Sequence, residues 1–242
     1  MPPAAAPPVV GPALPEWTPR PPPPRVAMRG EYCDVVPLSA EAHAAELYEA
    51  YTAPVATDLW TYTGPDTPPT ESRSTFEAWV AEDAALANRL VFAVVERGSG
   101  KALGTVAHQA WEPEHGVIEV GHVIFGRDLQ QTAAATEAIT LLLRRAFDEL
   151  GYRRVQWECD ALNAASRRAA ERLGFGLEGI LRQHRVTKMP QRSRDTAMFA
   201  MTDGDWQGRV RGAHEAWLAP GNFAEGGRQR SRLSELVARP RL

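Results

Sequence analysis

The chain has 242 residues, with 27 lysines and arginines, 30 aspartates and glutamates, a formal net charge of −3 and 44% hydrophobic residues. That length suffices for one domain of roughly 150–200 residues with further segments attached. The near-neutral charge argues against a dedicated nucleic-acid-binding protein, which usually carries a clear basic excess. The sequence has no apolar run of about 18 residues that could span a membrane, no secretory signal pattern, and only two cysteines, too few for a disulfide framework. We therefore expect a soluble, globular, cytoplasmic protein.

Both ends of the chain differ in composition from its middle. Residues 1–30 hold 11 of the 20 prolines and have no periodic apolar pattern. Such a segment buries too little surface to offset its ordering entropy, which predicts a disordered or polyproline-like leader. Residues 207–242 contain seven arginines and three glutamates. This arginine-rich C-terminal extension either wraps onto the domain through Trp217, Leu218 and Phe223 or hangs free, and the folded core is expected over residues 31–206.

Within this core the hydrophobic pattern predicts alternating strands and helices. A strand (35–38) and a helix (40–51) precede a loop rich in proline, glycine and threonine (60–70), a second helix (75–87), and a hairpin of strands 90–96 and 102–109 around the turn at 97–100. A strand (117–125), the strongest helix (133–150, ended by Gly151), a strand (155–159), a helix (164–173) and two strands (179–185 and 196–201) follow. This order predicts an α+β domain with a mixed sheet and helices on both faces.

The most informative region runs from residue 117 to residue 205. Its distinctive features, in order, are the strand sequence IEVGHVIF, the tetrapeptide ATEA at 135–138, Asn163-x-x-Ser166, Leu173-Gly174-Phe175, Glu178-Gly179 and Arg182. In this order and spacing they resemble the GNAT acetyltransferase superfamily, and within it the Rim type, named for enzymes that acetylate the N-terminal amines of ribosomal proteins. The resemblance covers residues 31–206 and implies a GNAT fold, whose mixed, mostly antiparallel central sheet is splayed in the middle.

The resemblance also implies acetyl-CoA as co-substrate. A helix N-terminus offers unpaired amides and a positive dipole end to a pyrophosphate. The family opens this helix with Arg/Gln-x-x-Gly-x-Gly/Ala, whereas this chain has alanine at the central glycine, and a methyl group there could obstruct the phosphate. By resemblance the pantetheine arm pairs with the open edge of the preceding strand, and Asn163 contacts CoA, caps the next helix, or does both. The expected cofactor-binding residues are Val123, Ile124, Phe125, Gln130, Gln131, Thr132, Ala133, Ala134, Ala135, Thr136 and Asn163.

Glu119 is the candidate general base. A carboxylate among apolar neighbours has a raised pKa and can accept the proton of an amine, directly or through water. Strand alternation places Glu119 on the same face as residues 121, 123 and 125, and Rim-type relatives carry a glutamate at the matching position. Two alternatives remain open. Glu119 is instead a solvent-facing charge, or the base is His122, which strand alternation directs to the opposite face as a packed residue.

Ser166 is the candidate acid for the departing thiolate. Many GNAT enzymes use a tyrosine on the helix after the asparagine motif, but the matching residue here is Ala170. Ser166 is the remaining donor, as in the Rim type, and a thiol with a pKa of ~8.5 needs little help to leave. Its alternative role is to satisfy backbone amides in the first turn of the helix.

The acceptor pocket is expected in the early loop. Asp58, Trp60 and Tyr62 lie where relatives place a substrate-facing segment, and an acid beside aromatic rings suits a cationic amine. Aromatic loop residues also commonly act as lids over a core. The six histidines lack the spacing of metal ligands, so no metal is expected.

These features predict an acetyl-CoA-dependent N-acetyltransferase that acts by direct attack of a primary amine, without a covalent enzyme intermediate. The acceptor is a protein N-terminus or a small-molecule amine. The alternative is a CoA-binding regulatory or interaction module with little turnover, favoured by the alanine at 133 and the arginine-rich extension. A homodimer, common in the family, is left open.

Overall fold

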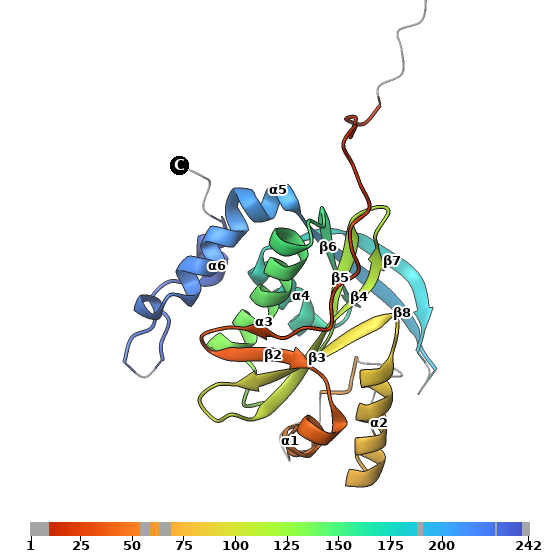
Figure 1. Ribbon diagram of the computed structural model, residues 1–242, viewed down its shortest axis with the longest axis vertical. Coiled ribbons are helices and arrows are strands. Elements are labelled where there is room, and N and C mark those ends of the chain that lie inside the picture. The colour runs from red at the N-terminus through yellow and green to blue at the C-terminus, as the bar shows by residue number, and fades with distance from the viewer. Residues whose placement is uncertain (1–9, 54–58, 63–68, 188–190, 226, 239–242) are drawn as a thin grey trace, which may run out of the picture.

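The computed structural model describes residues 10–53, 59–62, 69–187, 191–225 and 227–238. Its centre is an eight-stranded sheet in the order β1-β2-β3-β4-β5-β6-β8-β7 (Figure 1). Neighbouring strands are antiparallel except for the parallel pair β5 and β6, so the prediction of a mixed, mostly antiparallel sheet is confirmed. The strands are β1 (Met28–Arg29), β2 (Cys33–Pro37), β3 (Arg89–Glu96), β4 (Ala102–Glu112), β5 (Val117–Phe125), β6 (Arg154–Asp160), β7 (Gly176–Val186) and β8 (Ser193–Thr202).

Helices cover both faces of the sheet (Figure 1). The first two, α1 and α2, pack together on one face, and α3 and α4 lie on the other, where the C-terminal helices α6 and α7 pack against them. None of the described helices is long and apolar enough to cross a membrane. The helices are α1 (Ala40–Thr52), α2 (Arg73–Ala85), α3 (Ala133–Arg144), α4 (Ala164–Leu173), α5 (Asp203–Asp205), α6 (Arg211–Leu218) and α7 (Leu233–Ala238).

Two hydrophobic cores lie on the two faces of the sheet, and β3 contributes to both. Val91 and Ala93 pack with the side chains of α1 and α2, whereas Phe92 and Val94 pack with those of α3. Because both faces of β3 are buried, its sequence is a continuous apolar run rather than an alternating one.

The sheet is splayed between β5 and β6. These strands are paired only over residues 117–119 and 154–156. Beyond this point β5 stays paired with β4 and β6 stays paired with β8, so the two halves of the sheet separate. The predicted splay is confirmed, and it leaves the last residues of β5 with an open edge toward β6.

The helix predicted at 133–150 follows β5 and crosses to β6. It begins after Thr132, whose hydroxyl accepts a hydrogen bond from the Ala135 amide at 3.1 Å. After α3 the chain continues as a π-helical segment, Arg145–Glu149. Gly151 then adopts a φ of +70°, a conformation that glycine reaches without strain and that ends the helix.

From residue 17 onward, the N-terminal segment lies along the domain (red in Figure 1). Trp17 donates from Nε1 to the Glu114 carbonyl at 2.9 Å, and the Tyr152 hydroxyl donates to the Pro21 carbonyl at 3.0 Å. Arg145, which is 5% exposed, donates to the carbonyls of residues 26 and 27, just before strand β1. Over residues 17–29 the structure therefore differs from the disordered alternative of the predicted disordered or polyproline-like leader, because hydrogen bonds to main-chain carbonyls and the buried Met28 attach this segment to the domain.

The C-terminal extension wraps onto the domain, which is the first of its two predicted alternatives. Trp217 is buried, and Leu218 and Phe223 pack against the core that α3 and α4 share. His214 is also fully buried, with Nε2 donating to the Leu173 carbonyl at 2.9 Å and Nδ1 lying 2.7 Å from Thr140 Oγ1. These contacts join α6 to the two helices that border the splay.

Candidate active site

A cavity of about 1530 Å³ opens where β5 and β6 separate. It is larger than the roughly 300–1,000 Å³ typical of pockets for small ligands, which favours an extended ligand. The end of β5, the first turn of α3, α4 and the C-terminal extension form its walls. Of the predicted cofactor-binding residues, those that line it are Val123, Ile124, Phe125, Gln130, Gln131, Thr132, Ala133, Ala135, Thr136 and Asn163.

Ala134 is the exception among these predicted residues. It is absent from the cavity lining and only 4% exposed, and it belongs to the hydrophobic core beneath α3. Its side chain therefore points into the core, so its predicted contact with the cofactor stays a prediction that concerns only its main-chain amide. Successive residues of a helix point in different directions, so the first turn cannot present all of its side chains to one ligand.

A β-bulge sets which way the residues of β5 point. Thr105 of β4 pairs with Ile124 of β5, and Ala107 pairs with Gly121. One residue of β4 therefore lies opposite two residues of β5. His122, one of these two, has a φ of +48°. The extra residue reverses the alternation, so that residues 123 and 125 pack toward α3 while residue 124 packs toward α1 and α2. The predicted single face for residues 119, 121, 123 and 125 is therefore wrong.

Helix α3 presents its amino end to the cavity. Gln130 fixes the preceding loop, because its Nε2 donates to the Phe125 carbonyl at 2.8 Å while its Oε1 accepts from Arg127 at 3.2 Å. The first amides of a helix have no intrahelical acceptor. The Thr132 hydroxyl accepts the hydrogen bond of the Ala135 amide. Ala133 and Ala135 both line the cavity. The first turn can thus offer main-chain donors and a dipole end to an anion, with the Ala133 methyl group beside them.

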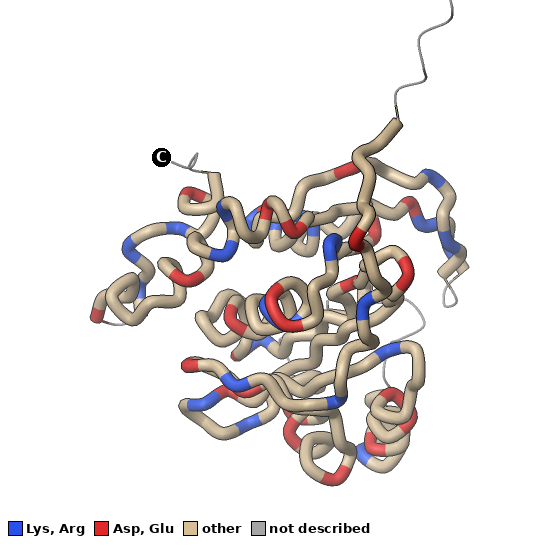
Figure 2. The backbone as a smooth tube through the Cα atoms, turned by 45° about the horizontal axis from the view of Figure 1, so that its top comes forward, with Lys and Arg blue, Asp and Glu red and all other residues tan. Residues whose placement is uncertain are grey.

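The charges around the cavity are of one sign. Among the described residues that line it, Arg127, Arg168, Arg172 and Arg228 are cationic and none is acidic. The chain as a whole carries a net charge of −3, and Figure 2 shows basic and acidic residues interspersed along the described backbone. The positive lining is therefore a local property of this cavity, and it favours a ligand with several negative charges.

Asn163 and Ser166 lie at the start of α4 and also line the cavity. Asn163 caps the helix, because its Oδ1 accepts the Ser166 amide at 3.0 Å. The Ser166 hydroxyl accepts a hydrogen bond from Trp157 Nε1 at 3.0 Å. Because the indole can only donate, the hydroxyl keeps its own proton available for another acceptor.

Glu119 is buried, with only 6% of its surface exposed. Burial is the main cause that raises the pKa of its carboxyl to about 7, and the nearby Glu158 charge adds to it. Gln109 opposes this shift, since its Nε2 donates to Glu119 Oε1 at 2.8 Å. The alternative of a solvent-facing charge is therefore wrong. Glu119 does not line the cavity, but it forms the last parallel pair with Gln156, immediately before the strands separate.

Gly121 leaves the space that this carboxylate requires. A Cβ atom at position 121 would lie 2.5 Å from Gln109 Nε2 and 2.7 Å from Glu119 Oε1. Both distances are shorter than any ordinary contact, so a side chain here would displace the pair. This function of Gly121 depends on cross-strand packing and cannot be recognised from the sequence alone.

His122 points toward α2, on the same side of the sheet as Glu119. Its Nε2 lies 2.9 Å from Asp83 Oδ2, its Nδ1 lies 3.2 Å from Arg89 Nη1, and its side chain is only 2% exposed. The bulge overturns the prediction that His122 faces the opposite side. The expectation that it is a packed histidine fits this buried contact with Asp83.

The predicted acceptor residues are separated in the structure. Asp58 lies outside the described residues. Trp60 packs edge-on against Tyr51, with ring centroids 5.4 Å apart, and so matches the alternative of a lid over the core of α1 and α2. Tyr62 lines the cavity beside Leu59.

The C-terminal extension supplies part of the cavity wall that sequence reasoning missed. Its aromatic residues suggest packing onto the domain, but nothing in their spacing predicts a ligand site. The extension contributes Trp217, Pro220, Phe223, Gly227, Arg228 and Gln229, and Tyr32 joins them from the N-terminal side.

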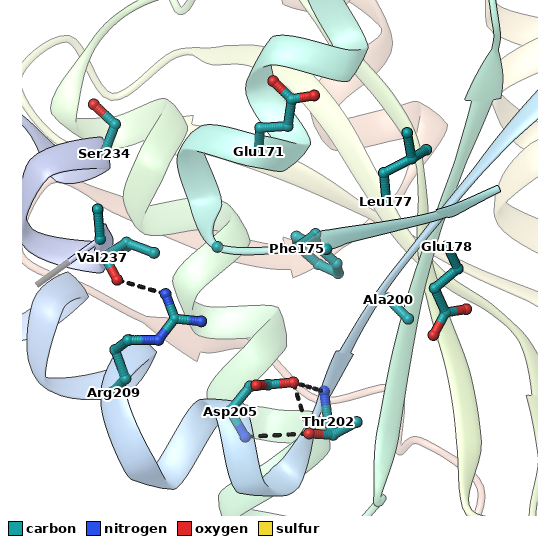
Figure 3. Close-up of a pocket in the computed structure, with 13 residues that line it drawn as sticks. Glu171, Phe175, Leu177, Glu178, Ala200, Thr202, Asp205, Arg209, Ser234 and Val237 are labelled. Atoms are coloured by element: carbon teal, nitrogen blue, oxygen red, sulfur yellow. Dashed lines mark hydrogen bonds between the residues drawn. The ribbon is translucent and has the colours of Figure 1, made fainter. Parts of the chain in front are cut away.

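A smaller pocket of about 410 Å³ lies between the end of α4, β7, β8 and α7 (Figure 3). Several of its polar groups form hydrogen bonds within the protein. Asp205 and Thr202 form a capping box, and Arg209 donates to the Val237 carbonyl. None of the predicted site residues lines it. Over the described residues, moreover, no group of three or more histidine, cysteine, aspartate or glutamate side chains could hold a metal ion.

A mixed sheet that splays beside a cationic cavity, with a helix N-terminus in the cavity wall, defines the architecture of an acyl-CoA-dependent transferase. The family model described as an acetyltransferase (GNAT) domain matches residues 35–176, more than half of the chain. The chain therefore belongs to the GNAT family of N-acetyltransferases, whose members use acetyl-CoA.

Solved and curated relatives agree with this family. The crystal structure of a GCN5-related N-acetyltransferase from Brucella melitensis is 42% identical, with a TM-score of 0.88, and the match covers 93% of this chain and 99% of that one. An uncharacterized N-acetyltransferase, p20, of Bacillus licheniformis is 27% identical over 122 residues, which is 50% of this chain and 66% of that protein's length, just under two thirds. The ribosomal-protein-S5-alanine acetyltransferase of Vibrio fischeri shares the fold, with 16% identity, a TM-score of 0.59, and coverage of 75% of this chain and 98% of that one.

Proposed function

We propose that this protein transfers the acetyl group of acetyl-CoA directly to a primary amine, with Glu119 as the general base. One observation carries the proposal. The parallel pairing of β5 and β6 ends at Glu119, a buried carboxylate with a pKa of about 7, and the arginine-lined cavity opens immediately beyond it. A base for the amine and a site for an extended anion therefore meet at the splay.

The donor site fits acetyl-CoA. Four arginines and the first-turn amides of α3 can hold a pyrophosphate, and the open edge at residues 123–125 can pair with the amides of a pantetheine arm. When bound, acetyl-CoA supplies an acetyl thioester as the electrophile. The residues of the chain then have to hold the thioester where the strands separate, deprotonate the amine and protonate the departing sulfur.

Glu119 is suited to deprotonate the amine. A general base works best when its pKa lies near the operating pH, and a carboxyl with a pKa of about 7 is partly ionised under neutral conditions. Its carboxylate takes a proton from the ammonium group, and the free lone pair attacks the acetyl carbon. Because Glu119 and the cavity-lining residues 123 and 125 lie on opposite sides of β5, the amine approaches from the side of α1 and α2.

Ser166 is suited to assist the leaving group. Its hydroxyl lines the cavity and is oriented by the hydrogen bond from Trp157. As the carbon–sulfur bond breaks, the hydroxyl donates its proton to the thiolate. It recovers a proton from solvent, to which the attacking nitrogen releases its second proton, so that a neutral amide is left. Asn163 holds the backbone of this turn in place through its cap.

Two kinds of acceptor fit the proposal, a protein N-terminus and a small amine. The fold shared with a ribosomal-protein acetyltransferase supports the first. The second acid near the base, Glu158, favours a cationic amine of either kind. A CoA-binding module with little turnover is the second candidate function, and Ala133 at the cavity wall is the observation in its favour.

A thiol-release assay with a panel of amines separates these functions. Acetyl-CoA is incubated with the protein and with peptides of different N-terminal residues, polyamines or other primary amines. Release above background with at least one amine, and its loss in Glu119→Gln, is the expected result. Tight acetyl-CoA binding without release for any amine would favour the binding module instead.

A further inference from the structure

Part of the cavity wall comes from beyond the family domain. The family model ends at residue 176, yet residues 217–225 and 227–229 of the extension supply Trp217, Pro220, Phe223, Gly227, Arg228 and Gln229 to the lining. We call these residues the C-terminal lip. Arg168 and Arg172 of α4 line the same cavity, and Arg172 contacts Trp217 of the lip.

The lip is built as a closed unit. Asn222 donates from Nδ2 to the Trp217 carbonyl at 3.0 Å and accepts the Ser231 amide at 2.9 Å, and Trp217 Nε1 donates to Gln229 Oε1 at 2.8 Å. The buried His214 ties the preceding helix to the domain, and burial lowers its pKa to about 4, so it is neutral at neutral pH. The lip is thus held in place independently of any ligand.

The chemistry of the lip is aromatic and cationic. Phe223 is half-buried and packs edge-on against Trp217 and Tyr32, with ring centroids 5.2 Å and 5.8 Å apart. The Arg172 guanidinium already covers the Trp217 ring at 4.8 Å, so Phe223 and the neighbouring Pro220 are left as the apolar surface facing the cavity.

Two exposed arginines line the cavity together with this apolar surface. Arg228 of the lip and Arg168 of α4 are both exposed, and no ion pair with an acidic residue occupies either of them within the described residues. A flat apolar surface beside unpaired guanidinium groups is suited to an aromatic base that carries a phosphate.

We propose that the C-terminal lip binds the 3′-phosphorylated adenosine end of the acetyl-CoA donor, with Phe223 and Pro220 against the adenine and Arg228 on the 3′-phosphate. The inference rests on the proposed function, since it assumes that the cavity holds the donor. It adds that the specificity for CoA over its dephosphorylated form comes from a segment outside the family domain.

Calorimetric binding of three probes, CoA, 3′-dephospho-CoA and pantetheine, tests the lip. Arg228→Glu should weaken CoA binding about tenfold more than dephospho-CoA binding, because both carry the pyrophosphate but only CoA carries the 3′-phosphate, and tenfold is the scale of one charge-assisted hydrogen bond. Phe223→Ala should weaken CoA and dephospho-CoA to the same extent and leave pantetheine unaffected. Arg230→Glu is the matched control, because Arg230 is an exposed arginine of the same extension that does not line the cavity.

The possible outcomes distinguish a failure of the lip proposal from a failure of the whole donor site. If the wild-type protein binds CoA and both lip variants bind it equally well, the lip has no such role while the donor site stands. The same conclusion follows if Arg228→Glu weakens CoA and dephospho-CoA alike. If the wild-type protein binds neither nucleotide, the proposed function and the lip are both overturned. Unchanged thermal unfolding midpoints of the variants show that they are folded.

Discussion

The side-chain amide of Gln109 donates a hydrogen bond to Glu119 Oε1 over 2.8 Å, from β4 to β5. This bond stabilises the ionised carboxylate, whereas burial and the Glu158 charge favour the protonated form. The balance leaves the pKa of Glu119 at about 7. The strand partner thus keeps a buried carboxyl in the range where it can exchange a proton near neutral pH.

Removing this bond should shift the pH dependence of acetyl transfer. Gln109→Leu takes away the donor that favours the charged form, so the pKa of Glu119 should rise above about 7. The rising limb of kcat/KM against pH should then move to higher pH, with the plateau less affected. The control is Gln207→Leu, which removes a glutamine whose side chain donates to Asp148 at the surface. A profile for Gln109→Leu that coincides with that of the wild type contradicts the proposed balance.

Glu119→Gln should stabilise the protein at alkaline pH. The pKa of Glu119 is raised from 4.5 to about 7 in the folded state, so folding favours its protonated form. The contribution of the protonated Glu119 carboxyl to the free energy of unfolding is fully present below pH 4.5, and it is lost as the pH rises through about 7. The variant carries no such loss, so its free energy of unfolding should exceed that of the wild type by about 1–3 kcal/mol at pH 8. Urea unfolding at pH 4.5 and 8 measures the difference, and an equal difference at both pH values would contradict it.

Ala133→Gly tests the methyl group at the cavity wall. If this methyl group crowds the pyrophosphate, glycine should tighten acetyl-CoA binding even though it costs up to about 1 kcal/mol in helix stability. Ala134→Gly is the matched control, because Ala134 belongs to the same turn but is buried in the core. Calorimetric titration with acetyl-CoA should show tighter binding for the first variant only. Unchanged or weaker binding would show that the turn already accommodates alanine.

Deleting residues 1–27 should lower stability without altering catalysis. The buried Arg145 loses its two carbonyl acceptors and Tyr152 loses that of Pro21, at a cost of at least about 1–3 kcal/mol. None of these residues lines the cavity, so kcat/KM at low temperature should not change. Tyr152→Phe removes one of the bonds and should cost about 1 kcal/mol. Denaturant unfolding provides the readout, and a truncated protein as stable as the full chain would contradict the assignment.

The sequence predicts the middle of the fold well because the local pattern is strong there. The continuous apolar run of β3 and the apolar face of α3 are visible without any tertiary contact. The cavity residues from 123 to 136 follow from the family resemblance, since their order along the chain reflects one strand, one loop and one helix start. Ala134 differs from its neighbours because a helix turn divides its side chains between core and ligand, so that only its main chain is left to meet the cofactor.

The remaining differences between the predictions and the structure have causes that a local sequence pattern does not show. The bulge at His122 requires a positive φ at a residue other than glycine, and nothing in the neighbouring sequence predicts this conformation. The proline-rich segment attaches through carbonyl groups that every residue type possesses. The C-terminal lip becomes part of the cavity only when α6 packs against α3. Each of these depends on contacts between distant parts of the chain.

The assignment of Glu119 as the general base is tested by the pH dependence of kcat/KM for Glu119→Gln, measured on an amine that the wild-type protein accepts. General-base catalysis contributes about 10²–10⁴-fold, so the variant should lose that much at neutral pH and less at high pH, where more free amine exists. Its dissociation constant for acetyl-CoA should stay unchanged, because Glu119 does not line the cavity. Ser166→Ala should lose less, since a thiolate leaves with little assistance. Near-full activity of Glu119→Gln at neutral pH, together with its loss in His122→Ala, would contradict the account and assign the base to the histidine.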